Sequence, residues 1–154
     1  MRAPRIYESG YSCIVVPRIR NATTDETFCT AMDIRQLFDD SDNVEQFQAG
    51  DVIFREGDQA HHMYVVLQGD IELRVADRAV GQCRAGDIMG EMAIVGSHKR
   101  TATAVAISAC RLVPVTERRF VLLVQEQPYF ALHVMKILTD RIVRKEHEMH
   151  TGVP

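Results

Sequence analysis

The residues best suited to chemistry in this chain lie in one stretch, from Gly90 to Thr103. Gly90 allows the backbone to approach a ligand because no Cβ stands in the way. The next residues, Glu91-Met92-Ala93-Ile94, suit one short helical turn, whose free N–H groups would point at an anion. Arg100 carries a planar guanidinium that can donate two charge-assisted hydrogen bonds to a phosphate. The stretch therefore predicts a binding site for a small phosphate.

Glu91 does not fit a site that binds phosphate alone. Its carboxylate would repel the phosphate, so it must face another part of the ligand, such as a ribose hydroxyl that donates a hydrogen bond to it. Phosphate and ribose together indicate a nucleotide. Taken one at a time, these residues are better explained by loop packing or a solvated charge, and only their combination at this spacing favours a site.

This combination resembles the phosphate-binding cassette of the cyclic nucleotide-binding domain family. Gly90-Glu91-Met92-Ala93 is followed by Arg100-Thr101-Ala102-Thr103, and the arginine comes nine residues after the glutamate. The family includes catabolite activator protein, the regulatory subunit of protein kinase A and cyclic-nucleotide-gated channels. The resemblance runs from about Met32 to about Arg144. Many members have a proline before the arginine, whereas His98-Lys99 stands here, which predicts a looser loop and a second positive charge at the phosphate.

The resemblance implies a regulatory domain that binds cAMP or cGMP, with cAMP favoured, and that is not an enzyme. The residues expected to contact phosphate and ribose are Met89, Gly90, Glu91, Met92, Ala93, Arg100 and Thr101. Thr101 can also hydrogen-bond the 2-amino group of guanine, which keeps cGMP as a ligand. No catalytic residue, no metal and no cofactor beyond the nucleotide is expected.

The purine must be held by residues outside the cassette, and Val75 and Arg141 are predicted to contact it. Val75 lies on the inner face of a predicted strand. In the channel branch of the family an arginine on the last helix covers the purine, and gap-free alignment from the cassette gives that role to Arg141. The alternative is that Arg141 forms a surface ion pair with an acid such as Glu126 or Glu148.

The composition indicates one globular domain. The chain has 154 residues, of which 46% are hydrophobic and 25% charged. Its net charge of −3 gives no basic field, so neither nucleic acid nor a membrane surface is predicted as a partner. No apolar run approaches the ~20 residues of a membrane span, which favours a cytoplasmic protein. The four cysteines form no C-x-x-C pair and are predicted to be free thiols rather than metal ligands.

The pattern between Asn43 and Val115 predicts a mainly β domain, with an antiparallel β-roll of the jelly-roll type, a double-stranded β-helix. Short β-rich runs alternate with Gly-Asp pairs, which are typical of tight turns. The predicted strands cover residues 44–47, 52–54, 63–67, 71–76, 80–84, 103–106 and 111–115.

Helices are predicted on both sides of this roll. The first runs from Thr24 to about Asp39-Asp40, and a short cassette helix follows within the roll. Thr116 is a natural N-cap for the next helix, and Pro128 begins a longer amphipathic helix over residues 129–148. Residues 1–24 are predicted to be an irregular N-terminal arm, which leaves residues 25–154 as the cyclic nucleotide-binding domain.

Two other classes of function compete with a nucleotide sensor. Metal-dependent cupin enzymes have a similar strand pattern but need a His-x-His whose imidazoles converge. His61 and His62 are adjacent, would point to opposite faces of a strand, and are predicted to lie in a solvated turn. The stronger alternative is a protein-interaction domain of the same fold that binds no nucleotide, followed by a transcription-regulator-like protein without its DNA-binding domain.

The preferred interpretation is a stand-alone cyclic nucleotide sensor that changes the position of its C-terminal helix on binding. Its signal would pass to an unidentified protein partner, or to a second copy of the chain in a homodimer through the C-terminal helix.

Overall fold

The computed structural model describes residues 33–151. The predicted arm (1–24) and most of the predicted helix from Thr24 lie outside this range. The part of that helix inside the range is a single 3-10 turn, η1 (Ile34–Leu37), and the Asp33 carboxylate caps its start by accepting a hydrogen bond from the Arg35 N–H at 3.0 Å. Ile34 and Phe38 from this segment are buried in the core.

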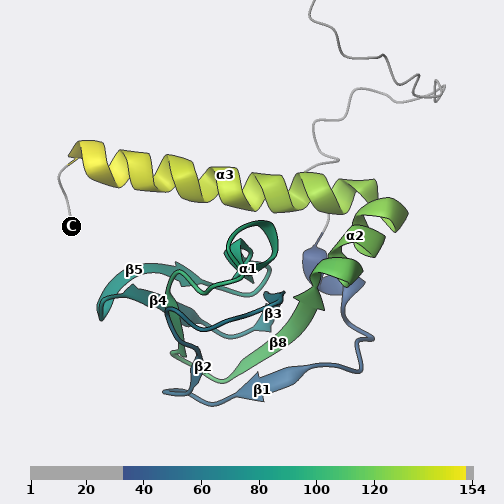
Figure 1. Ribbon diagram of the computed structural model, residues 1–154, viewed down its shortest axis with the longest axis horizontal. Coiled ribbons are helices and arrows are strands. Elements are labelled where there is room, and N and C mark those ends of the chain that lie inside the picture. Colours follow the sequence, from purple (N-terminus) through teal and green to yellow (C-terminus); the bar gives the residue numbers. More distant parts are fainter. Residues whose placement is uncertain (1–32, 152–154) are drawn as a thin grey trace, which may run out of the picture.

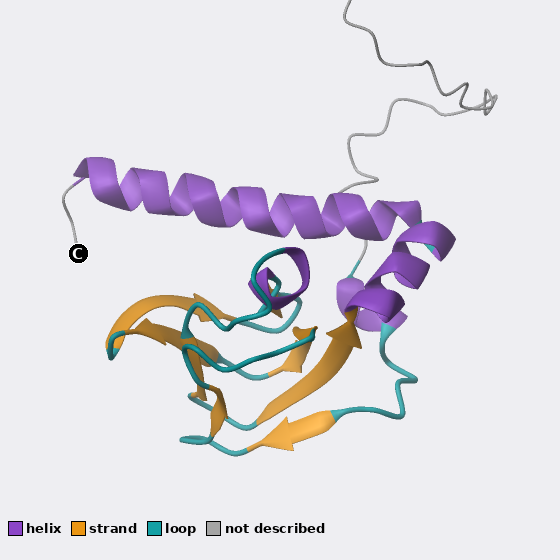
Figure 2. Cartoon of the chain, viewed as in Figure 1, coloured by secondary structure: helices purple, strands orange, loops and turns teal. Residues whose placement is uncertain are grey.

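Two four-stranded antiparallel sheets form the body of the described chain (Figures 1 and 2). One sheet has the order β1 (Glu45–Phe47), β8 (Cys110–Thr116), β3 (His62–Gln68) and β6 (Ile88–Met89). The other has the order β2 (Val52–Phe54), β7 (Thr103–Ala106), β4 (Ile71–Val75) and β5 (Arg78–Cys83). The predicted β-roll is therefore confirmed.

The seven predicted strands are present, with ends that differ from the prediction by no more than two residues. The strand β6 was not predicted, because two residues are too short to show alternation. It pairs with β3 through Tyr64↔Met89 and Val65↔Ile88, and so places Met89 and Gly90 at the edge of the roll.

The central strand β3 is buried on both faces, which is why its sequence is a continuous apolar run. Tyr64 and Val66 belong to the cluster between the two sheets, and Met63 and Val65 belong to a second cluster under the helices. The second cluster includes Phe130 and Val134 of α3, together with Ile34, Phe38, Ile88, Val113 and Val115. The roll is thus fixed to the N-terminal half of α3.

Three α-helices accompany the roll within the described residues. The cassette helix α1 (Met92–Val95) begins one residue later than predicted. Helix α2 (Glu117–Glu126) begins at the predicted N-cap, where the Thr116 hydroxyl accepts from the Arg119 N–H at 3.3 Å. Helix α3 (Pro128–Thr151) lies across the side of the roll that carries α1 (Figure 1). None of the described helices is long and apolar enough to span a membrane.

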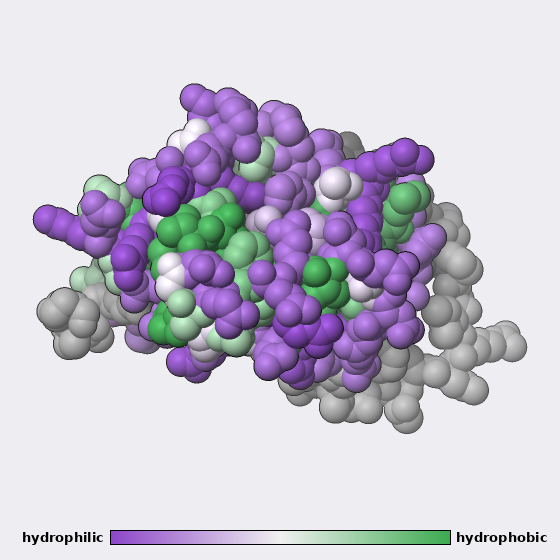
Figure 3. Space-filling model, turned by 90° about the horizontal axis from the view of Figure 1, so that it is seen from below, coloured by the Kyte–Doolittle hydropathy of each residue, from purple (hydrophilic) through white to green (hydrophobic). Residues whose placement is uncertain are grey.

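The side of the roll away from α3 is largely hydrophilic, with hydrophobic patches of limited extent (Figure 3). This follows from strand alternation, since outward positions such as Glu72 and Arg74 of β4 form an ion pair at 2.5 Å while Ile71 faces the core. The predicted site residues lie on the other side of the roll, near α1 and α3.

Candidate functional site

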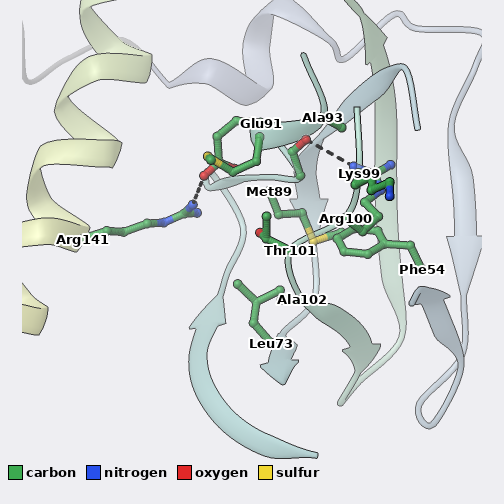
Figure 4. Close-up of a pocket in the computed structure, with 12 residues that line it drawn as sticks. Phe54, Leu73, Met89, Glu91, Ala93, Lys99, Arg100, Thr101, Ala102 and Arg141 are labelled. Atoms are coloured by element: carbon green, nitrogen blue, oxygen red, sulfur yellow. Dashed lines mark hydrogen bonds and ion pairs between the residues drawn. The ribbon is translucent and has the colours of Figure 1, made fainter. Parts of the chain in front are cut away.

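A cavity of about 60 Å³ lies between the cassette, the sheet β2-β7-β4-β5 and helix α3 (Figure 4). Its lining residues are Phe54, Leu73, Met89, Gly90, Glu91, Met92, Ala93, Lys99, Arg100, Thr101, Ala102 and Arg141. The structure thus brings together every predicted site residue except Val75. Leu73, two residues earlier on β4, takes the wall position expected for Val75.

Arg100 is the buried charge of this cavity, with only 4% of its surface exposed. Its guanidinium carbon lies 4.1 Å from the centre of the Phe54 ring and 5.7 Å from that of Tyr64. The two rings are themselves stacked at 6.3 Å. Cation–π contact of this kind holds a guanidinium in place without neutralising it.

No carboxylate among the described residues forms an ion pair with Arg100. Its Nη1 donates to the Gly90 carbonyl at 3.2 Å, and its Nε is buried with no hydrogen-bond partner. Burial lowers the pKa of Arg100, against weaker opposing effects of Tyr64, Asp58 and Glu91. Because an uncompensated buried charge is costly, this site favours an incoming anion.

Gly90 is necessary for this arrangement. Its φ of +73° lies in the left-handed region, and a Cβ at this position would collide with Nη1 of Arg100. The glycine predicted from the motif therefore gives the arginine room as well as giving the backbone freedom.

Glu91 and Arg141 meet across the mouth of the cavity (Figure 4). Arg141 Nη1 lies 3.6 Å from Glu91 Oε1, and each side chain is about one-fifth exposed. Arg141 also donates to the Ile88 carbonyl and contacts the Cys83 sulfur at 3.5 Å. Among the side chains that the structure describes, the ion-pair partner of Arg141 is thus Glu91 in the cavity. Burial raises the pKa of Cys83 to about 11, so the thiol stays protonated.

The loop before Arg100 is well tied down, contrary to the looser loop predicted from the missing proline. His98 adopts a φ of +56°, and its Nδ1 lies 2.8 Å from the Ala93 carbonyl of α1. The Ala60 N–H donates to the His98 carbonyl at 2.9 Å, and the backbone N–H of Arg100 donates to the backbone carbonyl of Asp58 at 2.9 Å. These bonds replace the stiffness that a proline would give. Lys99 remains exposed at the cavity.

The prediction for the adjacent histidines was right for His61 and wrong for His62. His61 is exposed, whereas His62 begins β3, is half-buried, and places Nε2 3.4 Å from Nη2 of Arg100. Extending the β3 alternation by one residue would have placed His62 on the same face as Tyr64. Among the described side chains, no three His, Cys, Asp or Glu residues are grouped to hold a metal.

Comparisons with known proteins agree with this geometry. Residues 44–127 match the model of the cyclic nucleotide-binding domain. Lysophospholipase NTE1 of Chaetomium globosum is 34% identical over 63% of this chain, and the cAMP-dependent protein kinase regulatory subunit of Mycosarcoma maydis is 27% identical over 56%. The chain spans only 7% and 18% of these two relatives.

A solved structure from a cyclic-GMP-dependent signalling pathway of bacterial phytopathogenesis is also similar, with a TM-score of 0.56 and 27% identity. The match covers 66% of this chain and 84% of that one. Since the family model covers more than half of the sequence and includes the whole cassette, the chain belongs to the cyclic nucleotide-binding domain family.

Proposed function

We propose that residues 25–154 form a regulatory module that binds a cyclic nucleotide, cAMP in preference to cGMP, and that the module is not an enzyme. The observation that carries this proposal is the buried guanidinium of Arg100, which has no carboxylate partner among the described residues and lies in the same cavity as Glu91. A cation and an acceptor so placed suit the two ends of a ribose cyclic phosphate.

In this proposal the phosphate lies against Arg100 and the turn that begins at Gly90. The backbone of Met89, Gly90, Met92 and Ala93 lines the phosphate and ribose, and Glu91 accepts a hydrogen bond from the ribose 2′-hydroxyl. Thr101 is exposed at the cavity, where its hydroxyl can form a hydrogen bond with a purine. Leu73 supplies the apolar wall that was expected from Val75.

Helix α3 acts as a lid in this proposal. The cavity of about 60 Å³ is well below the ~300 Å³ at the lower end of small-molecule pockets, so a nucleotide needs more room than this cavity offers. We expect the purine to displace Arg141, whose guanidinium can then stack on the base. This displacement provides the change in α3 that a regulatory module needs.

The preference for cAMP is supported by the similarity to a cAMP-dependent kinase subunit. The similarity to a protein of a cyclic-GMP-dependent pathway makes cGMP the second ligand to test. Thermal unfolding with and without each nucleotide measures whether cAMP and cGMP bind. At a concentration 100 times Kd, a ligand of the folded state alone should stabilise it by about 2.7 kcal/mol, or several degrees in Tm. AMP serves as the control that lacks the cyclic phosphate. No shift with either cyclic nucleotide at millimolar concentration would favour an interaction domain that binds no nucleotide.

We further infer that α3 pairs with α3 of a second copy. Exposed large apolar side chains of α3 lie at positions 129, 132, 135, 142, 143 and 149, and those at 132, 135, 142 and 149 are separated by three, seven and seven residues, so they share one stripe of the helix. Two identical stripes are complementary to each other. Nucleic acid is not expected as a partner, because the net charge is −3.

Sedimentation velocity tests this pairing. The wild type is expected to sediment as a dimer, and Ile142→Glu as a monomer, because a charge at the centre of the stripe would be buried without a partner. Val95→Glu is the matched control, since Val95 is 73% exposed and belongs to α1 rather than to α3. A monomeric wild type, or an Ile142→Glu variant that stays dimeric, contradicts pairing through this face.

A further inference from the structure

His62 is in direct contact with the arginine to which the phosphate site is assigned. Its Nε2 lies 3.4 Å from Nη2 of Arg100, and its ring packs edge-on against Tyr64 at 4.9 Å and 85°. A guanidinium can only donate hydrogen bonds, so Nε2 of His62 has to accept. The contact therefore requires a neutral imidazole with its proton on Nδ1. It holds Nη2 of Arg100, while the Gly90 carbonyl holds Nη1.

The groups that face His62 come from each element packed around it. Arg100 approaches from the loop before β7, and Glu45 from β1, where its carboxylate accepts from the Tyr64 hydroxyl at 3.0 Å. His61 precedes it in the chain, and Thr116, its register partner on β8, carries no charge. Burial lowers the pKa of His62 most, Arg100 and His61 lower it further, and Glu45 opposes them. His62 is thus neutral at neutral pH in the ligand-free protein.

We propose that His62 is a positioning residue for Arg100, and that it takes up a proton when a cyclic phosphate binds to that arginine. This inference rests on the proposed function, because it requires the phosphate to bind at Arg100. A bound phosphate monoanion neutralises the guanidinium and so removes its repulsion of a protonated His62, which is the second cause, after burial, of the lowered His62 pKa. Protonation ends the hydrogen bond from Arg100, because a protonated imidazole cannot accept at Nε2, but by then the bound phosphate holds the guanidinium in place. Nucleotide binding and proton uptake are then one coupled event.

The sign of the pH dependence follows from linkage. The His62 pKa is lower in the free protein than in the complex, so the complex binds more protons and affinity rises as pH falls through that interval. Above both pKa values the affinity is constant. The cyclic phosphodiester keeps one negative charge throughout. We expect the Kd for cAMP to fall by about three- to ten-fold from about pH 8 to about pH 5.5, as a bound charge of one sign typically shifts a neighbouring pKa by up to one unit.

Calorimetric titration of the full chain with cAMP tests this in two phosphate-free buffers that differ in ionisation enthalpy. The difference in observed heat gives the number of protons taken up, which should reach about 0.3 to 0.5 per site near pH 6 and vanish near pH 8. His62→Gln keeps an acceptor oxygen for Arg100 but cannot titrate, so it should bind near wild-type strength at about pH 8 and show no gain on acidification. His61→Gln is the matched control, because His61 is exposed and makes no hydrogen bond to Arg100, and it should retain the pH dependence.

Three outcomes separate the ideas. Failure of the wild type to bind either cyclic nucleotide at any pH refutes the proposed function itself. Binding without proton uptake in the wild type overturns the role of His62 and leaves the nucleotide site intact. The same pH gain in His62→Gln as in the wild type also overturns it. If His62→Gln does not fold, an NMR titration of the His62 ring in the wild type decides, since its pKa must rise when cAMP is added.

Discussion

Arg100→Ala is expected to weaken cAMP binding by about 30- to 1,000-fold, which corresponds to about 2 to 4 kcal/mol. The guanidinium is desolvated, lies in van der Waals contact with Phe54 and meets no carboxylate in the described chain. A phosphate that loses such a partner is left in a cavity with no buried positive charge. Isothermal titration of the variant with cAMP measures the change directly.

The control for this variant is its neighbour, Lys99→Ala. Lys99 also lines the cavity, but its side chain is exposed, so removing its charge should change the free energy of binding by no more than about 1 kcal/mol. Equal effects of the two substitutions would mean that the phosphate does not lie on the buried guanidinium. Circular dichroism of the ligand-free variants should confirm that both keep the fold.

Arg141→Ala is expected to weaken cAMP binding by about ten-fold and to abolish ligand-induced protection of residues 129–148 from amide exchange. Arg141 is the residue through which α3 reaches the cavity, by its ion pair with Glu91 at 3.6 Å and its hydrogen bond to Ile88. In the complex its guanidinium stacks on the purine for roughly 1 to 2 kcal/mol. Hydrogen exchange with and without cAMP reports on the helix, and calorimetry reports on affinity.

Arg144→Ala provides the comparison for this lid. Arg144 lies one turn further along α3 and is exposed, so its loss changes the charge of the helix equally without touching the cavity. Affinity and protection should both stay near the wild-type values. Normal binding by Arg141→Ala, with α3 still protected, would instead make α3 a static scaffold and move the switch elsewhere.

The Glu91–Arg141 pair suggests how the two halves of the ligand are connected. Glu91 is the acceptor assigned to the ribose, and the same carboxylate holds Arg141 in the ligand-free chain. When the ribose hydroxyl occupies one carboxylate oxygen, Arg141 has to adjust, and the base then offers it a new partner. By thermodynamic reciprocity, whatever favours the ligand-free position of α3 must weaken nucleotide binding by the same factor by which the nucleotide disfavours that position.

Much of the architecture was determined by local patterns in the sequence. Alternation in Ile71–Val75 predicted β4, and Thr116 and Pro128 predicted the starts of α2 and α3 because capping and the missing proline N–H act within one turn. The cassette could likewise be found in the sequence, since Gly90, Glu91 and Arg100 are close along the chain. Where the signal was too short, as in β6, the pattern failed.

The tertiary structure alone decided which residues surround the cassette arginine. Phe54 and Tyr64 stack beneath it and His62 touches it from 38 residues away, through contacts that depend on the pairing of β3 with β6 and on the closure of the two sheets. Arg141 finds Glu91 and Ile88 only because Phe130 and Val134 anchor α3 on the roll. Spacing along the sequence predicts neighbours within a turn or a strand, but the partner of a buried charge depends on which elements pack against it, and that is set by the burial of the whole core.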